Sequence, residues 1–290
     1  MPNWKGQSKG NVLGYSLFLF FLRSFGLSFA YFVLRFVSFY YFLFTGKKHP
    51  YYYFRHIHNY SPLKSFFSIY LNYLTFGKTL LDKTALLSGI SVDFTYNFEN
   101  EHYLRNMKEG GFLISAHVGN WEIAGQLLNR IETRFNIVMF DAEHSRIKDY
   151  FDKVLKDKNF NIIVIRDDMS HVFEINRAIK AKELVCLHGD RFVSAEDALE
   201  VTFMGKKALF PKGPFYLASR YQVPVSFVFA MKESAKHYHF TATEPKIYYA
   251  ETRNDMTNKT ESAMKDYIAE LEKIVTLYPL QWFNYYRFWN

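Results

Sequence analysis

The chain begins with a long, nearly continuous apolar stretch. Residues 14–46 are almost all aliphatic or aromatic, and their charged exceptions are Arg23 and Arg35. The uninterrupted apolar runs are shorter than the about 20 residues that cross a bilayer comfortably. Three arrangements fit: a tilted transmembrane helix or hairpin with arginines at the headgroups, a helix in the membrane interface, and a pair of core helices. We expect membrane attachment, with residues 1–48 as an anchoring segment and 49–290 as one domain.

The rest of the chain alternates between the two periods of regular secondary structure. Residues 61–87 carry apolar side chains at helical spacing, and residues 91–98 alternate with a period of two, which predicts a helix and then a half-buried strand. Further strands are expected at 112–116, 135–140, 161–165, 184–188 and 223–230, with an edge strand at 237–243. Helices are expected at 121–130, 147–155, 171–180, 214–220 and 264–278. This alternation predicts an α/β fold with a sheet covered by helices on both faces.

Composition narrows the function only slightly. Hydrophobic residues make up 49% of the chain and aromatic residues 20%, and the net charge is +8. A basic protein attracts nucleic acid, anionic lipid or acidic proteins, but no nucleic-acid-binding motif occurs, so we expect no nucleic-acid partner. The histidines lack the spacing of a metal site, and we expect no metal. The single cysteine, Cys186, lies in an apolar run and is expected to be buried and inert.

One stretch carries chemistry, from Ser115 to Glu122. An apolar strand ends near His117, a Gly-Asn pair turns the chain, and Asn120 is a good N-cap for a helix whose first turn contains Glu122. Across such a turn a carboxylate can meet an imidazole, fix its tautomer and leave the second nitrogen to take a proton. The carboxyl ends of strands are also where ligands bind in open α/β sheets. A glutamate that complements the helix dipole beside a structural histidine fits these residues equally well.

The sequence His117-Val118-Gly119-Asn120-Trp121-Glu122 resembles the His-x4-Asp/Glu motif of the bacterial lipid A biosynthesis acyltransferases, relatives of the glycerophosphate and lysophospholipid acyltransferases. Other segments follow in that family's order: Tyr52-Tyr53-Phe54-Arg55, Gly189-Asp190-Arg191, Phe203-Met204-Gly205, Lys212-Gly213-Pro214, Val223-Pro224-Val225, Pro279-Leu280-Gln281-Trp282-Phe283 and Phe288-Trp289. The chain departs from the family at Asp190-Arg191, where many members carry Asp-Gln, so the acceptor does not follow from the resemblance.

The resemblance implies a mixed sheet flanked by helices, as in glycerolipid acyltransferases, and a hydrophobic N-terminal membrane helix or hairpin. It also implies transfer of a fatty acyl chain from acyl carrier protein or coenzyme A to a lipid hydroxyl, at the cytoplasmic face of a bacterial inner membrane. No cofactor is expected besides this thioester cosubstrate. His117 would be the general base and Glu122 would orient it, while backbone N–H groups around Gly119 or a nearby arginine would bind the oxyanion.

Several substrate contacts and alternatives stay open. The expected substrate-binding residues are Arg166, Asp190, Arg191, Lys212 and Gly213, although surface ion pairs or a solvated basic loop would also fit. Basic residues around Lys206, Lys207 and Lys212 are expected to face an acidic acyl carrier protein. The acceptor is expected to be a lipid A precursor; a lysophospholipid, an aminolipid or a pigment is the alternative. A non-catalytic membrane-associated binding protein of the same fold is a further reading.

Overall fold

The computed structural model describes residues 12–87, 89–90, 92–120, 123, 131–140, 160–166, 168–192 and 195–289. The helices expected at 121–130 and 147–155 therefore lie outside the described residues, except for Ile123, which is helical.

The centre of the molecule is a seven-stranded mixed sheet in the order β1-β9-β8-β2-β5-β3-β4. Its strands are β1 (Thr95–Glu99), β2 (Gly111–Ser115), β3 (Phe135–Phe140), β4 (Phe160–Ile165), β5 (Leu184–His188), β8 (Val225–Lys232) and β9 (His237–Ala242). Neighbouring strands run parallel except β8 and β9, which are antiparallel. The predicted α/β fold with a mixed sheet is confirmed.

Two details of the sheet differ from the sequence-based expectation. The strand expected at an edge, β9, lies inside the sheet, because β1 pairs with it in parallel on the side away from β8. In addition, β6 (Ala198–Phe203) and β7 (Lys206–Pro211) form a separate antiparallel hairpin, so Lys206 and Lys207 belong to a strand and not to a loop. Met204 and Gly205 have φ values of 52° and 76°, which is the left-handed geometry that a tight hairpin turn requires.

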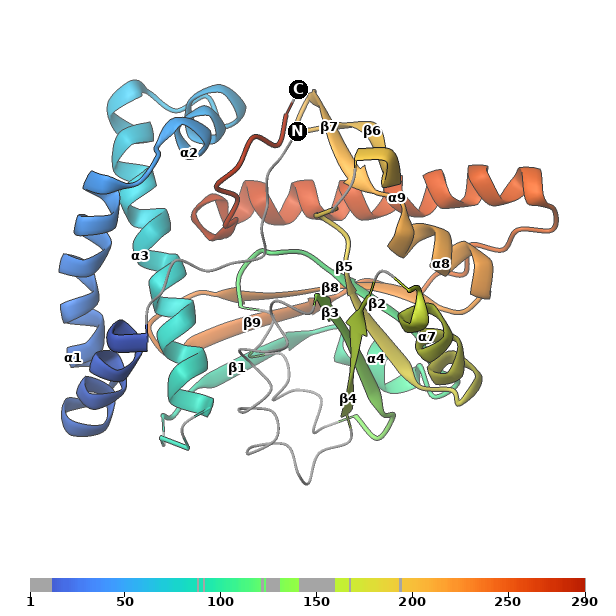
Figure 1. The fold of residues 1–290 in the computed structure, drawn as a ribbon, viewed down its shortest axis with the longest axis horizontal. Coiled ribbons are helices and arrows are strands. Elements are labelled where there is room, and N and C mark those ends of the chain that lie inside the picture. Colours follow the sequence, from blue (N-terminus) through green and yellow to red (C-terminus); the bar gives the residue numbers. More distant parts are fainter. Residues whose placement is uncertain are drawn as a thin grey trace.

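Helix α9 (Arg253–Leu277) supplies much of the core. Its apolar stripe, predicted from helical spacing, is buried at Met264, Tyr267, Leu271 and Val275. Figure 1 shows α9 above β8 and β9 and running in roughly the same direction, with α8 (Gly213–Tyr221) beside α9. The shorter helices are α4 (Glu101–Asn106) and α7 (Ser170–Lys180), and α7 connects β4 to β5.

The N-terminal helices form a pair at one end of the molecule. They are α1 (Val12–Phe44) and α3 (Pro62–Leu87), joined through α2 (Lys48–Tyr52) and a π-helix over Tyr53–Ile57. Figure 1 places α1 and α3 side by side at the end opposite α7. An added Cβ at Gly77 of α3 would lie 2.6 Å from Leu34 Cδ1, so this glycine permits the close approach of the two helices.

Helix α1 is interrupted and one-sided. Gly26 has a φ of 79°, which breaks the helical path. Residues of α1 at helical spacing are buried, among them Leu27, Ala30, Leu34, Ser38 and Phe42. All phenylalanines between these positions, Phe29, Phe32, Phe36 and Phe39, are exposed. Among the described residues one helix, Phe20–Phe44, is long and apolar enough to cross a membrane, a result of length and composition only.

Candidate active site

Two parallel strands that are neighbours in the sheet bring the site together. β2 and β5 pair in register with Ser115 opposite His188, so the residues two positions beyond them, His117 and Asp190, emerge at the same edge. His117 Nδ1 lies 2.8 Å from Asp190 Oδ1. The backbone N–H of His117 donates to Asp190 Oδ2 at 3.0 Å. Asp190 therefore holds both the ring and the backbone of His117, at the carboxyl edge where ligands bind in such sheets.

The electrostatics of this pair favour an ionised carboxylate. Burial of Asp190, whose side chain is 2% exposed, would by itself raise its pKa. The charge and hydrogen bond of His117, together with the neighbouring Arg191 guanidinium, outweigh burial and hold the Asp190 pKa well below its ordinary value. An ionised Asp190 accepts a proton-bearing Nδ1, which makes Nε2 the nitrogen that can take a proton from a ligand. The His117 side chain is 17% exposed, so the pair reaches the surface through the imidazole.

A second histidine completes the site. The ring of His188, the last residue of β5, lies 4.3 Å from that of His117 between centroids, at an interplanar angle of 33°. Burial, and to a smaller extent the neighbouring His117, lower the pKa of His188 to about 3, so His188 is neutral near pH 7. Nitrogen and oxygen atoms of His117, His188 and Asp190 lie within 4.8 Å of one another, residue types that can hold a metal ion. Both Asp190 oxygens already accept hydrogen bonds from His117, and this arrangement favours proton transfer over metal binding.

The turn after His117 is clamped from two sides. Gly119 has a φ of 61°, and a Cβ at this position would lie 2.0 Å from the carbonyl oxygen of Ala230 on β8. Its N–H donates to Gln281 O at 2.9 Å, and the N–H of Asn120 donates to Ala230 O at 2.8 Å. On the other side, the N–H of Phe283 donates to His117 O at 3.3 Å. Strand β8 and the C-terminal segment therefore fix this turn.

These bonds correct the expected oxyanion site. The N–H groups of His117, Gly119 and Asn120 donate to Asp190, Gln281 and Ala230, respectively. The prediction that N–H groups around Gly119 bind the oxyanion is therefore wrong for these three. The reason is tertiary: β8 and the residues after α9 approach this turn from parts of the chain more than 100 positions away.

The remaining predicted site residues fall in different places. Arg191 lies beside Asp190; its Nη2 donates to Phe283 O at 2.9 Å, and its guanidinium sits 5.8 Å from the Tyr286 ring centroid. Arg166 is exposed at the end of β4, and β3 separates that strand from β5. Lys212 and Gly213 are exposed at the start of α8. Glu122 lies outside the described residues, so its predicted contact with His117 stays a prediction.

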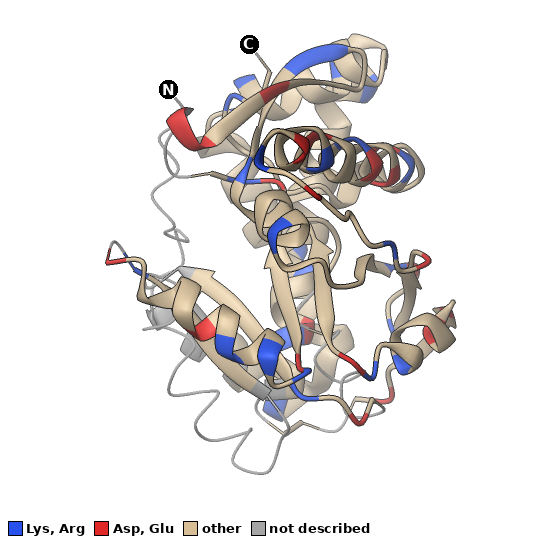
Figure 2. Ribbon diagram, turned by 90° about the vertical axis from the view of Figure 1, so that its right-hand side faces the viewer, with Lys and Arg blue, Asp and Glu red and all other residues tan. Residues whose placement is uncertain are grey.

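Two of the three lysines expected to face an acyl carrier protein have partners. Lys206 Nζ donates to the Tyr52 hydroxyl at 3.0 Å, and Lys207 Nζ pairs with Glu200 at 2.7 Å. Figure 2 shows how the lysines and arginines are spread over several elements on the face that it presents. This distribution does not support a single carrier-binding cluster at these lysines.

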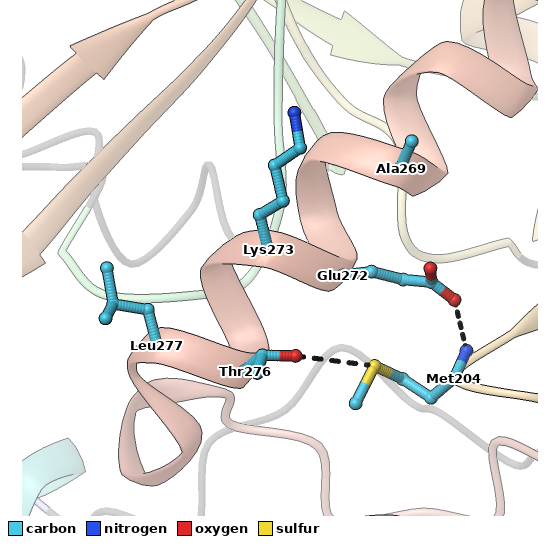
Figure 3. A pocket seen from close by; sticks show the side chains of 6 residues that line it. All are labelled: Met204, Ala269, Glu272, Lys273, Thr276 and Leu277. Atoms are coloured by element: carbon cyan, nitrogen blue, oxygen red, sulfur yellow. Dashed lines mark hydrogen bonds between the residues drawn. The ribbon is translucent and has the colours of Figure 1, made fainter.

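A surface hollow of about 560 Å³ lies between the β6–β7 turn and α9. It is lined by Met204, Ala269, Glu272, Lys273, Thr276 and Leu277. Figure 3 shows the Met204 N–H donating to the Glu272 carboxylate and Thr276 Oγ1 contacting Met204 Sδ at 3.9 Å. These bonds join the β6–β7 turn to α9, and the lining contains none of the predicted site residues.

The contact between Asp190 and His117 and the packing of His188 against His117 were not predicted from the sequence. A signal was present, because Asp190 follows the last residue of β5 by two positions and His117 follows that of β2 by two. The order of strands in the sheet was needed to show that these two strands are neighbours.

A histidine held by a buried aspartate, at the carboxyl edge of a mixed α/β sheet, is suited to remove a proton from a bound hydroxyl. The chain belongs to the bacterial lipid A biosynthesis acyltransferase family, whose model matches residues 83–290, and it is an acyltransferase. The matched region contains His117, Asp190 and the C-terminal segment that clamps the turn.

Two other comparisons add little. A crystal structure of the 1-acyl-sn-glycerophosphate acyltransferase from Thermotoga maritima is similar over 90% of this chain and 95% of that one, with 13% identity and a TM-score of 0.41. At that level the likeness carries no argument of its own. No curated protein sequence matches the chain significantly.

Proposed function

We propose that the protein is a membrane-associated O-acyltransferase that moves a fatty acyl chain from a thioester to the hydroxyl of a lipid, with His117 as general base. The observation that carries this proposal is the contact of His117 Nδ1 with Asp190, 2.8 Å long, at the carboxyl edge of the sheet. Asp190 was expected to contact substrate; its burial and its two bonds to His117 support a positioning role instead.

In the proposed reaction His117 Nε2 takes the proton of the acceptor hydroxyl as its oxygen attacks the thioester carbonyl. A C–O bond forms and the carbonyl becomes a tetrahedral oxyanion. Its collapse breaks the C–S bond, and the imidazolium returns its proton to the leaving thiolate. Asp190 stabilises the imidazolium between these steps, as a carboxylate does in other acid–base sites.

The proposal needs no covalent acyl-enzyme. The single cysteine, Cys186, is in the middle of β5, and burial raises the pKa of its thiol to about 12, so its thiolate is scarce at pH 7. Direct attack by the acceptor oxygen on the thioester is the simpler route.

Glu122 and the basic residues complete the proposal. Glu122 is proposed as a second carboxylate that supports His117, on the strength of the family motif. Among the proposed substrate-binding residues Arg191 has the best support, because it is adjacent to Asp190 and partly exposed. Arg166, Lys212 and Gly213 are proposed to contact the phosphate groups of the acceptor or of the donor, with Gly213 at the N-terminus of α8.

The match to a lipid A biosynthesis family supports a lipid A precursor as acceptor. We propose acyl carrier protein as donor and an active site on the cytoplasmic side of a bacterial inner membrane. Coenzyme A is the alternative donor; a lysophospholipid, an aminolipid or a pigment is the alternative acceptor. Both donors are acyl thioesters, and the proposed reaction requires each acceptor to offer a hydroxyl that loses its proton.

An aromatic face on α1 and α3 supports membrane association. Exposed large apolar residues follow one another on these two helices: Phe20, Phe25, Phe29, Phe32, Phe36, Phe39, Tyr40, Leu43 and Phe44 on α1, and Leu63, Phe66, Phe67 and Leu71 on α3. A contiguous apolar surface of this kind is unusual on a soluble monomer and is typical of a membrane contact. We propose that this face enters the bilayer, leaving open whether α1 lies in the interface or crosses it.

Acyl transfer by the purified full-length protein tests the function. The protein in vesicles would receive labelled acyl-ACP or acyl-CoA with each candidate acceptor, and the products would be identified by mass spectrometry. We expect a new ester with at least one acceptor. Absence of transfer to every acceptor from both donors, by a folded protein, would overturn the proposal. Identical turnover in a His117→Ala variant would overturn the mechanism.

Membrane binding can be tested with substitutions confined to the exposed aromatic face of α1. Replacing Phe25, Phe32 and Phe36 with serine removes apolar area and leaves the buried face of α1 intact, so sedimentation with anionic vesicles should fall about tenfold. Phe173→Ser is the matched control, because Phe173 is 76% exposed on α7 at the opposite end of the molecule. Unchanged sedimentation of the triple variant would show that this face is not the anchor.

A further inference from the structure

A buried cluster of charged and hydroxyl groups lies next to the catalytic loop, defined here as residues 117–120. Its centre is Asp82 of α3, whose side chain is fully buried, and Lys232 at the end of β8, whose side chain is 5% exposed. Lys232 Nζ is 2.5 Å from Asp82 Oδ2. Two tyrosine hydroxyls donate to the same carboxylate: Tyr31 of α1 to Oδ1 and Tyr238 of β9 to Oδ2. Two helices, α1 and α3, and the neighbouring strands β8 and β9 thus meet at one carboxylate.

Hydrogen bonds connect this cluster to the catalytic loop along two routes. Asn120 Nδ2 donates to the Tyr238 hydroxyl at 3.1 Å and to Thr79 O, one turn before Asp82 on α3, at 3.3 Å. The Gln281 side chain accepts from Lys232 N at 2.9 Å and donates to Lys232 O at 2.7 Å. The carbonyl of the same glutamine accepts the Gly119 N–H. The loop is therefore bonded to the cluster through a side chain at Asn120 and through the backbone at Gly119.

Stability alone is a poor explanation for such a cluster. Burial raises the pKa of Asp82 and lowers that of Lys232, and their contact opposes both shifts. A buried ion pair is often no more stabilising than apolar residues of the same size, but removal of one partner is costly. What a fully bonded polar network does provide is one defined arrangement of the groups that it joins.

We propose that Asp82, Lys232 and Tyr238 are positioning residues: they hold Asn120, and with it the backbone that carries His117, in a fixed place relative to the α1–α3 helix pair. This inference rests on the proposed function, in which His117 is the base. General-base catalysis depends on geometry, and a displacement of about 1 Å can cost up to about a hundredfold in rate. The same residues join the helices with the exposed aromatic face to the loop that carries His117.

The two tyrosines provide a matched pair of variants. Tyr238→Phe and Tyr31→Phe each remove one hydroxyl from the same carboxylate, but only Tyr238 contacts Asn120. In Tyr238→Phe we expect kcat to fall about tenfold while KM for acceptor and donor stays within about twofold, since the loop and not the binding surface is disturbed. In Tyr31→Phe we expect kcat within about twofold of the wild type. Melting temperatures of both variants should fall to a similar extent.

A second measurement is independent of the reaction. Amide hydrogen exchange over residues 117–120 should be faster in Tyr238→Phe than in the wild-type protein and unchanged in Tyr31→Phe. Wild-type kcat and exchange in Tyr238→Phe would overturn the inference. Equal loss of kcat in the two variants would also overturn it, because it would indicate a general loss of cluster stability. If the wild-type protein transfers no acyl group, the proposed function fails, while the exchange data still decide whether the cluster orders the loop.

Discussion

Two buried aspartates, Asp190 and Asp82, illustrate how similar groups serve different ends. Each is almost fully buried, and each contacts a nitrogen base from another part of the chain. The partner of Asp190 is His117, which is 17% exposed, whereas the partner of Asp82 is Lys232, which is 5% exposed. Only the first pair can reach a substrate. An acid–base pair can meet a substrate when one of its side chains is partly exposed, and it can only organise structure when both side chains are enclosed.

The two carboxylates also differ in their pKa shifts. Burial acts on both, but the Asp190 pKa is lowered because His117 and Arg191 outweigh it, and the Asp82 pKa is raised because burial dominates. The comparison predicts that substitutions in the His117–Asp190 pair reduce activity with little loss of stability. Substitutions in the Lys232–Asp82 pair should reduce stability first.

The largest expected effect on activity is that of His117→Ala. Without a base, kcat should fall by about 10²–10⁴. The melting temperature should stay within a few degrees of the wild type, because the backbone N–H at position 117 and the Arg191 guanidinium still stabilise the buried Asp190 carboxylate. Kinetics and thermal unfolding on the same preparation would check both. If His117→Ala also lost its fold, His117 would have a structural role like that of Lys232, and the two pairs would not differ as we expect.

Lys232→Met should have the largest effect on stability. It leaves the Asp82 carboxylate buried without its cation, which costs about 3–5 kcal/mol of unfolding free energy. The double variant Asp82→Asn/Lys232→Met removes both charges and should recover most of that loss. Chemical denaturation in detergent measures the difference. A double variant as unstable as the single one would show that the charge itself is not the cause.

Asp190→Asn should lower kcat about a hundredfold and keep most of the stability, because the amide can still meet the His117 ring but carries no charge to stabilise an imidazolium. Glu122→Gln in parallel tests which carboxylate supports the base. A far larger loss in Glu122→Gln than in Asp190→Asn would give the main role to Glu122.

The stability of the protein should fall as the pH falls below about 6.5, in part because of His188. Burial lowers its pKa from the ordinary 6.5 to about 3 in the folded state. Between these values the unfolded chain binds a proton at His188 and the folded chain does not, so unfolding is favoured as acid is added. Asp190 has a depressed pKa too, and its contribution is lost only below about pH 4.

His188→Gln should therefore flatten the decrease in melting temperature between about pH 6.5 and pH 4.5, by on the order of 5 °C. His102→Gln, at an exposed position of α4, is the control. Parallel curves for the wild type and His188→Gln would contradict the assignment.

The smallest expected effect belongs to Lys212→Glu, at the exposed start of α8. If this lysine faces an acidic carrier protein, KM for acyl-ACP should rise about two- to threefold at low salt and less for acyl-CoA. Lys265→Glu, on the exposed side of α9, is the control for net charge. Equal shifts for the two donors would indicate contact with the acceptor or the membrane.

Much of the fold was predictable from local patterns. The periods of apolar residues predicted α3, α7, β3 and β5 to within one residue or two, because helical and strand spacing are properties of short segments. The β6–β7 hairpin, with its left-handed turn at Met204-Gly205, was not predicted. The predicted edge position of β9 was wrong, because the residues of a strand do not by themselves determine which strands pair with it.

By itself the sequence determined the alternation of strands and helices, the long apolar segment near the start, and the placement of His117 at a strand end. Only the tertiary structure decided which groups His117 meets. Asp190 is 73 residues away in the chain. The carbonyl groups of Gln281 and Ala230 accept the N–H groups of Gly119 and Asn120, which were expected to bind an oxyanion. Local spacing fixes which way a side chain faces, but its neighbours depend on which strands lie side by side, and that is settled by the packing of the whole sheet.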